Sequence, residues 1–469
     1  MTLRIIPGAV STTSLRALVI SDESTPPKLA LTDLRGGACP TLKIGAHGSG
    51  DVRFDQHVNG AGLRLYLAEA SGLKPGTDYQ LGDAHMRTFP RQLGSDGVRI
   101  ALASCFSDQF KRDGDYLRVL QGAAGGTPLA AKLLVGDNLY VDVGPASRAA
   151  RSPFEETADR YLQYFWRSSY ARVLAYLPSF MLWDDHEFWN NYPEQQVWLP
   201  RSLGAAARDY GAAALAGIKA FQAVLNPAPA AAKGLSYKFA IPPLSCFALD
   251  LRAGRTRQGA ARPAMCSEAE LLAFEAWARG LEGPGALVVG QPLWQSPGDW
   301  QDWNPPAFAA QNARIWRALT DAPWDIVVIS GDVHHSHLIE IDVGPGRRVW
   351  ELVSSPACHI PTIESIASRA FDTQPGHGGA SVVPTLAVTG VAPRLHAYHM
   401  GTGCPNSIAL LHLTQIAGGG VRFAGSFIDL VRKTPAAGFT PANGIPVAPG
   451  DHAWCKRDPM FELHRRPEL

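Results

Sequence analysis

Short apolar runs at four distant places in the chain each end in a cluster of polar side chains. The runs span residues 98–103, 132–135, 180–183 and 325–330, and the clusters span 104–105, 136–140, 184–187 and 331–335. Aliphatic runs of this length bounded by polar turns are typical of buried β-strands. Ligand sites in mixed and parallel sheets concentrate beyond the carboxyl ends of the strands. The pattern therefore predicts one polynuclear metal site assembled from distant parts of the sequence.

The first 95 residues have a different pattern from the rest. Short alternating segments at 14–20, 62–67 and 73–81 are separated by turns, which predicts a small N-terminal β-sandwich of fibronectin or immunoglobulin type. A chain of 469 residues exceeds the usual limit for one core. We therefore expect two domains, 1–95 and 96–469, joined by a linker near 90–97.

From residue 98 onward, strand patterns alternate with helical ones, which predicts an α/β fold. An aromatic amphipathic helix is expected over 161–177, and an alanine-rich helix over 202–225 that ends before Pro227. A capping box at Ser267 predicts a helix start. The segment 368–391 is rich in Gly, Pro and Ser and is interpreted as a long surface loop near the site.

Composition narrows the class of protein. Hydrophobic residues make up 46% and charged residues 18% of the chain, and a net charge of +1 argues against a stable nucleic-acid partner. The seven cysteines form no CxxC pair, which argues against a disulfide scaffold or a zinc ribbon. No run is long enough to span a membrane. The start lacks an export signal, so a cytoplasmic location is expected, or a periplasmic or secreted one if a leader has been removed. The oligomeric state stays open.

Asp137 and Tyr140 form the first candidate pair of ligands. A carboxylate after a strand, preceded by Gly136, can bridge two cations, although a turn or helix N-cap aspartate would look the same. A tyrosine phenolate is a hard oxygen ligand that suits Fe(III), provided that a group with a pKa near ~10 is deprotonated. The alternative for Tyr140 is a buried ring packed against the sheet.

The cluster at 184–187 is the most suggestive. It contains three carboxylates and an imidazole in four residues. Adjacent carboxylates repel one another and raise one another's pKa, and a bound metal removes that conflict. Asp185 is the expected ligand, and His186 is placed to act on a leaving group. Asn191 is expected either to hydrogen-bond a substrate oxygen or simply to turn the chain.

The last strand end and the first supply further candidates. Asp332 and His334 are two residues apart, so an extended segment places them on one side, where they can hold one or two metals. The neighbouring His335 and His337 are interpreted as solvated loop histidines. Cys105 is either a thiolate ligand or an inert buried cysteine.

Two arginines follow the apolar segment 246–249. Arg252 and Arg255 have the fork geometry that binds a phosphate bidentately. An ion pair between Asp250 and an arginine is the structural alternative.

Taken in order, these pieces resemble the PhoD-like alkaline phosphatases of the metallophosphoesterase superfamily. The matching segments are Ala103–Cys105, Gly136–Asp142, Trp183–Tyr192, Leu249–Arg252, Ser330–His334 and Glu351–Pro356. The stretch from Trp183 to Tyr192 is the most specific of them. The Gly-Asp-x-x-Tyr element also looks like that of the purple acid phosphatases, whose tyrosine binds ferric iron.

The resemblance implies a four-layer α/β/β/α domain that hydrolyses the phosphate esters of small substrates at two or three metal ions. Fe(III) with Ca(II) is implied, with Zn(II), Mn(II) or Mg(II) as alternatives. The implied metal ligands are Cys105, Asp137, Tyr140, Asp185, Asp332 and His334, and the implied catalytic residues are His186, Arg252 and Asn191. A metal-activated hydroxide would attack phosphorus.

Two alternatives to a phosphomonoesterase stay open at this point. The same set of ligands serves phosphodiesterases and phosphotriesterases. A protein that binds metal without catalysing a reaction is the rival from another class.

Overall fold

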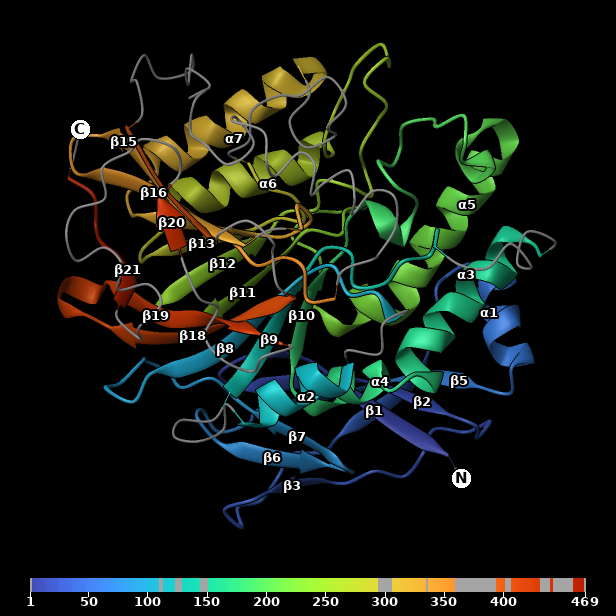
Figure 1. The fold of residues 1–469 in the computed structure, drawn as a ribbon. Helices are drawn as coiled ribbons and strands as arrows, with labels where there is room; N and C mark the ends of the chain where they lie inside the picture. The colour runs from blue at the N-terminus through green and yellow to red at the C-terminus, as the bar shows by residue number, and fades with distance from the viewer. Residues whose placement is uncertain are drawn as a thin grey trace.

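The computed structural model describes the chain at residues 2–108, 113–122, 129–143, 151–293, 306–334, 336–358, 394–400, 406–430, 439–441 and 459–467. The predicted surface loop at 368–391, and His335, lie outside these residues. The described strands form two small antiparallel sheets and two large mixed ones (Figure 1).

The N-terminal strands form the two small sheets. The first has the order β1 (Leu3–Val10), β2 (Ser14–Ser21), β5 (Arg64–Ser71), β4 (Lys43–His47), and the second β3 (Leu31–Asp33), β6 (Asp78–Leu81), β7 (Ala84–Arg87). Ile5 and Tyr79, one from each sheet, belong to the same apolar cluster as Val98 and Val327 further along the chain. One hydrophobic core therefore continues across the predicted boundary near residue 95. The helix α1 (Val52–Gly60), capped by Asp51, was not predicted.

The first large sheet carries three of the four predicted strands. Its order is β10 (Ser179–Leu182), β9 (Leu129–Val135), β8 (Val98–Ala103), β18 (Ser407–Gln415), β19 (Val421–Asp429), β21 (Pro459–Leu463). The strands β10, β9 and β8 run parallel, and the later ones are antiparallel. The parallel arrangement brings the carboxyl ends of β8, β9 and β10 to the same edge.

The second large sheet carries the fourth of the predicted strands. Its order is β11 (Tyr237–Ile241), β12 (Leu244–Ala248), β13 (Gly285–Val288), β14 (Ile326–Ser330), β16 (Arg347–Val353), β15 (His337–Gly344), β17 (Arg394–Met400), β20 (Phe439–Pro441). Here β12, β13, β14 and β16 run parallel. Both large sheets contain parallel and antiparallel strands, and helices pack beside them. The protein therefore has a mixed α/β fold, which agrees with the α/β class predicted from the sequence.

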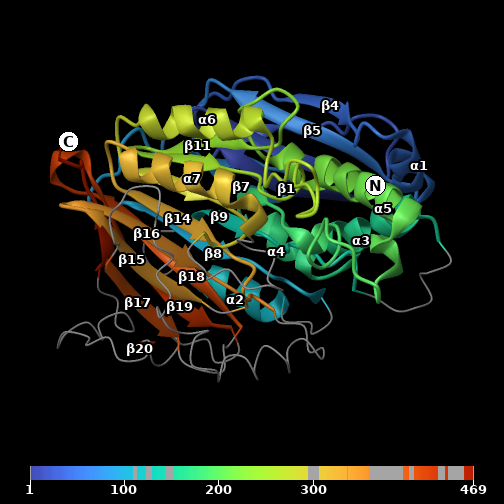
Figure 2. The ribbon, with the colours of Figure 1, turned by 90° about the horizontal axis from the view of Figure 1, so that it is seen from above.

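Alternation along the strands explains how the layers pack. On β14, Val327 and Ile329 belong to the cluster shared with the first sheet, whereas Ile326 and Val328 belong to a cluster with two helices. Those helices are α6 (Glu268–Arg279) and α7 (Ala309–Asp321). The outer face of the first sheet packs against α2 (Asp113–Gly122), α3 (Pro153–Leu162), α4 (Tyr170–Tyr176) and α5 (Gly204–Gly217). Figure 2 shows α6 and α7 beside one sheet and α2 to α4 beside the other.

The predicted helices are found with one correction. The expected continuous helix over 161–177 is wrong, because the backbone becomes extended at Ser168, between a π-helical turn at 163–167 and α4. The alanine-rich helix runs from Gly204 through a π-helical and a 3-10 turn to Leu225 and ends at Asn226, as predicted. The Ser267 side chain accepts a hydrogen bond from the Glu270 amide, which confirms the predicted cap.

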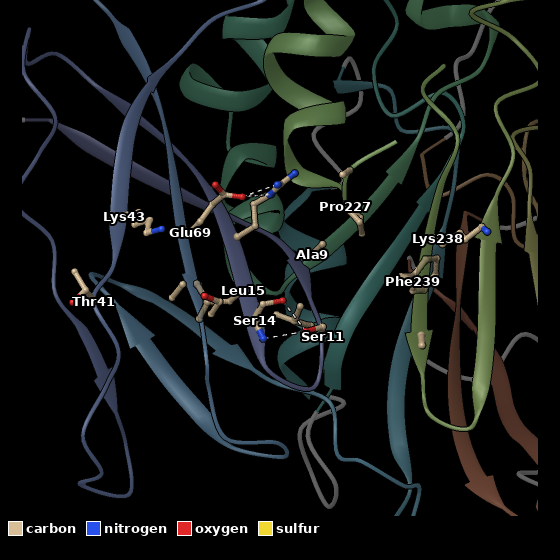
Figure 3. A pocket seen from close by; sticks show the side chains of 16 residues that line it. Ala9, Ser11, Ser14, Leu15, Thr41, Lys43, Glu69, Pro227, Lys238 and Phe239 are labelled. Carbon is tan, nitrogen blue, oxygen red and sulfur yellow. Dashed lines mark hydrogen bonds and ion pairs between the residues drawn. The ribbon is translucent and has the colours of Figure 1, made fainter. Parts of the chain in front are cut away.

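A cavity of about 450 Å³ marks the place where the N-terminal sheet meets the second large sheet (Figure 3). Arg16, which lines this cavity, joins the N-terminal sheet to the segment after the alanine-rich helix. Its guanidinium pairs with Glu69 at 2.6 Å and also donates to the carbonyl of Asn226, beyond the end of the alanine-rich helix. Polar contacts as well as the shared core therefore join the N-terminal strands to the rest of the protein.

The described C-terminal residues are fixed by one buried arginine. Arg466, 4% exposed, donates to the Asp325 carboxylate at 3.0 Å and to the carbonyl oxygens of Leu319 and Thr320 at the end of α7. Asp325 immediately precedes β14, so this contact joins the chain end to the central strand of the second sheet.

Replacing that arginine should be costly. Arg466→Met should lower the free energy of unfolding by about 3–5 kcal/mol, because a buried carboxylate loses its guanidinium partner. Arg422→Met removes the exposed pair with Glu462 and should cost under about 1 kcal/mol. Urea unfolding followed by tryptophan fluorescence measures both, and equal losses would contradict this role for Arg466.

Candidate metal centre

Glycines allow the strand ends of the two sheets to meet. A Cβ atom on Gly331, after β14, would lie 2.2 Å from the Val135 carbonyl oxygen and 2.4 Å from Ser104 Cβ, both in the first sheet. A Cβ on Gly136 would lie 3.1 Å from the Gly290 oxygen, and Gly136 has a φ of +89°. Larger residues would push the two strand edges apart, so these glycines set the spacing of the site.

Strained backbone marks the same place. Among the described residues, positive φ occurs at Cys105 (54°), Asp137 (51°), Asn191 (57°), Asp332 (70°) and His334 (54°), and at one further non-glycine position. Each such residue costs free energy, and such residues persist where the surrounding structure holds them. The strain falls on five of the residues singled out from the sequence.

The predicted ligands come together around Asp137. Its Oδ2 atom lies 3.6 Å from the Cys105 sulfur and 3.4 Å from the Tyr140 hydroxyl, which is itself 3.3 Å from His334 Nε2. In the part of the chain that the structure describes, three groups have potential ligand atoms that all lie within 4.8 Å of one another: Cys105–Asp137–His334, Asp137–Asp185–His186 and Asp184–Asp185–Asp332. Asp137 and Asp185 each belong to two groups, so the groups form one continuous cluster.

The cluster is unfavourable without positive charge. Burial raises the pKa of Asp137 well above its usual range, and the carboxylates of Asp185 and Asp332 raise it further. Burial and Asp137 likewise raise the pKa of the Cys105 thiol, and burial and Cys105 raise that of Tyr140. Cations inside the cluster would reverse these shifts, because they stabilise every ionised ligand at once.

The hydrogen bonding of Asp185 shows whether these residues can hold metal ions. Its Oδ2 atom accepts the Asn191 amide, but its Oδ1 atom is buried and has no hydrogen-bond partner among the described residues. A buried carboxylate oxygen without a partner is unfavourable unless a cation binds it. Carboxylate, phenol, imidazole and thiol donors together match the ligands of iron and other transition metals. The residues present therefore fit a metal centre.

His186 is held in place by a residue that the sequence analysis missed. Its Nδ1 atom lies 2.9 Å from both carboxylate oxygens of Asp142, which also accepts the Asn190 amide at 2.8 Å. Burial would raise the pKa of Asp142, but His186 and Arg201 hold it below its usual range. Asp142 lies two residues after Tyr140, and that position in the motif was the available signal.

Glu187 has a structural role. Its carboxylate accepts the amides of Asn138 at 2.8 Å and Asp184 at 3.0 Å, which fixes the two ligand segments to each other. Burial raises its pKa to about 8. Asn138 completes the link by donating to the Leu182 carbonyl and to Gln222. The carboxylates of the 184–187 cluster thus divide between the metal cluster and its support.

Ser355 is a second residue that sequence reasoning missed. Its hydroxyl lies 3.2 Å from the Cys105 sulfur and accepts the His334 amide at 3.0 Å. It therefore connects two predicted ligands that follow strands of different sheets. Ser355 lies in the matching segment Glu351–Pro356, and that position was the available signal.

Arg252 occupies a different place from the one expected. Its guanidinium is 1% exposed and donates through Nε to Asp184, through Nη1 to the Tyr192 carbonyl, and through Nη2 to Gln291. These bonds position Asp184, and a phosphate clamp would have to give them up, so the role of Arg252 toward a phosphate stays a prediction. Asp250 accepts the backbone amide of Arg252 at 2.9 Å.

The two remaining candidates, Arg255 and Asn191, make contacts within the protein. Arg255 is buried and donates to Gln291 at 2.6 Å and to the Leu251 carbonyl. Asn191 contributes its backbone amide to Asp185, and its side chain is half-buried. The backbone contact makes Asn191 a support of the proposed ligand, and its role toward a substrate stays a prediction.

The glycine contact gives a direct test of the site. Gly331→Ala should destabilise the protein by about 1–3 kcal/mol and lower its metal content, because the new methyl group overlaps Val135 and Ser104. Gly45→Ala is the matched control, since a Cβ there meets nothing within 4 Å. Thermal unfolding and elemental analysis of both purified variants measure the effect. A Gly331→Ala variant with wild-type stability and metal content would show that the close approach is unimportant.

Comparisons with known proteins leave the family open. No family model matches the chain, and no curated protein matches it. Among solved structures, one match is "GAP50 the anchor in the inner membrane complex of Plasmodium", with 10% sequence identity and a TM-score of 0.40. The match covers 75% of this chain and 90% of that chain. Similarity at this level does not bear on the chemistry of the site.

Proposed function

We propose that the protein is a metal-dependent hydrolase of phosphate esters, similar to the PhoD-like alkaline phosphatases. The observation that carries the proposal is the overlap of three potential ligand groups through Asp137 and Asp185. Carboxylates shared between neighbouring groups are what a centre of two or more metals requires. The resemblance of the sequence motifs supports phosphate esters as the substrate class.

The ligands of the centre would be the donors of the cluster. Cys105 and Tyr140 lie near Oδ2 of Asp137, His334 lies near the Tyr140 hydroxyl, and these residues would hold iron. Asp185 and Asp332 would supply the oxygen ligands that calcium or another hard cation prefers. Metal ions bound there would supply Lewis acidity, which activates water and neutralises charge on the phosphoryl group.

His186 is proposed to donate a proton to the leaving group. Asp142 accepts from Nδ1, so the ring keeps a fixed orientation and directs Nε2 away from Asp142. The ring centre lies 4.3 Å from that of Tyr140, which places it beside the proposed ligands. From there, His186 would protonate the departing alkoxide.

The fold is proposed to be the four-layer α/β/β/α type. Residues of the two large sheets share one apolar cluster, and their opposite faces share separate clusters with two sets of helices. Strand ends from both sheets contribute to the ligand groups, as this arrangement would require.

Removal of the shared ligand tests the function. Asp137→Asn should lose most of its bound metal and its hydrolysis of phosphate esters, because one oxygen between two ligand groups loses its charge. Turnover of matched mono-, di- and triesters, measured with elemental analysis before and after chelation, checks this and identifies the preferred ester. Wild-type turnover by this variant, or turnover of none of the esters by metal-loaded wild type, would contradict the proposal.

The role of His186 predicts a dependence on the leaving group. His186→Ala should lower kcat by about 10²–10⁴-fold for esters of poor leaving groups and less for good ones, which need no proton. Asp142→Asn should show the same trend more weakly, since it alters only the orientation of the ring. Rates for a series of aryl and alkyl esters test this. An equal loss across the series would make His186 a positioning residue.

The proposed role of Tyr140 predicts that the protein binds Fe(III) and is coloured. A phenolate bound to Fe(III) absorbs visible light, so concentrated protein should be pink to purple, as the resemblance to purple acid phosphatases implies. Tyr140→Phe removes the oxygen and keeps the ring, so it should bleach the protein and lower its iron content. Visible spectra and iron analysis decide the matter. Colourless wild-type protein, fully active with zinc or magnesium alone, would rule out iron.

A further inference from the structure

A short loop beside the site exposes two large apolar side chains. Val197 is 84% exposed and Trp198 is 73% exposed. The other exposed large hydrophobic residues among those described, Leu34, Val52 and Leu272, occur singly along the sequence. Single exposed apolar residues are normal on protein surfaces, whereas adjacent ones with this exposure indicate a binding surface.

The loop is closed by its own hydrogen bonds. The Gln196 amide donates to the Ser202 hydroxyl at 2.8 Å, and that hydroxyl contacts the carbonyls of Gln196 and Leu199. Gln196 and Ser202 are both buried, so the ends of the loop are anchored while its tip is exposed. A closed loop of this kind presents Val197 and Trp198 as a fixed feature of the surface.

The base of the loop is connected to the proposed centre. The Gln196 side chain donates to the Asn190 carbonyl at 2.7 Å, and the Asn190 amide donates to Asp142, the partner of His186. On the other side, Arg201 donates to the carbonyl of Val141 and to Glu156. The apolar tip therefore has a fixed position relative to the residues proposed for catalysis.

Two exposed arginines line a pocket that the ends of the loop also reach. Gln195 and Gly204, on either side of the 196–202 loop, line a pocket of about 600 Å³ together with Arg208 and Arg257. Neither arginine has an ion pair with a carboxylate among the described residues, although Arg257 donates to the Pro193 carbonyl. An apolar loop tip with exposed arginines near the ends of the loop is complementary to an anionic lipid surface, where tryptophan favours the interface and arginine favours the headgroups.

The size of the tip also favours lipid over a protein partner. A stable protein interface buries roughly 800 Å² on each side. Two side chains supply only a small part of that area. Inserted into a bilayer interface, the same two side chains and the neighbouring arginines give reversible binding without a large contact area.

We propose that the 196–202 loop inserts Val197 and Trp198 into an anionic lipid surface and holds the neighbouring site against phosphate esters in that surface. The first part stands on the loop and its charges alone. The second part, that the substrate is carried by lipid, rests on the proposed function.

Vesicle binding by the full chain tests the proposal. Wild-type protein should sediment with mixed phosphatidylcholine–phosphatidylglycerol vesicles. The double variant Val197→Ser/Trp198→Ser should bind at least about ten-fold more weakly. Arg208→Gln and Arg257→Gln should each weaken binding by about five-fold on mixed vesicles and have little effect on pure phosphatidylcholine.

Control variants separate this proposal from the proposed function. Leu272→Ser removes an exposed apolar side chain from α6 and should bind vesicles as wild type does. Asp137→Asn should also bind vesicles normally, so loss of hydrolysis leaves the lipid result intact. Three outcomes would overturn the proposal: no sedimentation of wild type, wild-type sedimentation of the double serine variant, or a wild-type dimer that the serine variant converts to monomer.

Discussion

The close approach of strand ends from two different sheets is the constraint on which the site depends. Gly331 lies against Val135 and Ser104 at distances that leave no room for a Cβ atom, and Gly136 lies against Gly290 at a distance that a Cβ atom would make tight. Because of that approach, Asp137 from the first sheet and Asp332 from the second interact inside one buried cluster. Sheets packed side chain to side chain stand about 10 Å apart, too far for short side chains to share a ligand.

Bringing these residues together has an electrostatic and a conformational cost. Carboxylates, a thiol and a phenol are buried side by side, and several of them adopt backbone conformations that other residues avoid. Supporting contacts hold the arrangement: Glu187 binds the amides of both ligand segments, and Arg252 pairs with Asp184. These contacts stabilise the segments around the cluster, and bound cations would offset the negative charge of its ionised groups.

The sequence predicted the parts of this design that depend on local pattern. Strands such as 98–103 and 326–330, and the cap at Ser267, follow from apolar periodicity and turn chemistry. The role of Arg252 could not be predicted, because its partner Asp184 lies 68 residues away and packing decides the pairing. Asp142 and Ser355 lie in matching segments of the sequence, but their contacts with His186 and Cys105 also depend on packing. The break at Ser168 interrupts a helical pattern that continues on both sides of it in the sequence.

Anomalous X-ray diffraction from crystals of the purified protein would test the central claim most directly. Data collected at metal absorption edges locate bound ions independently of activity. The account predicts at least two neighbouring peaks that share Asp137 as a ligand, one of them also in contact with Oδ1 of Asp185. Crystals grown with the same metals that show no peak in this cluster, with the side chains arranged as described, would contradict it.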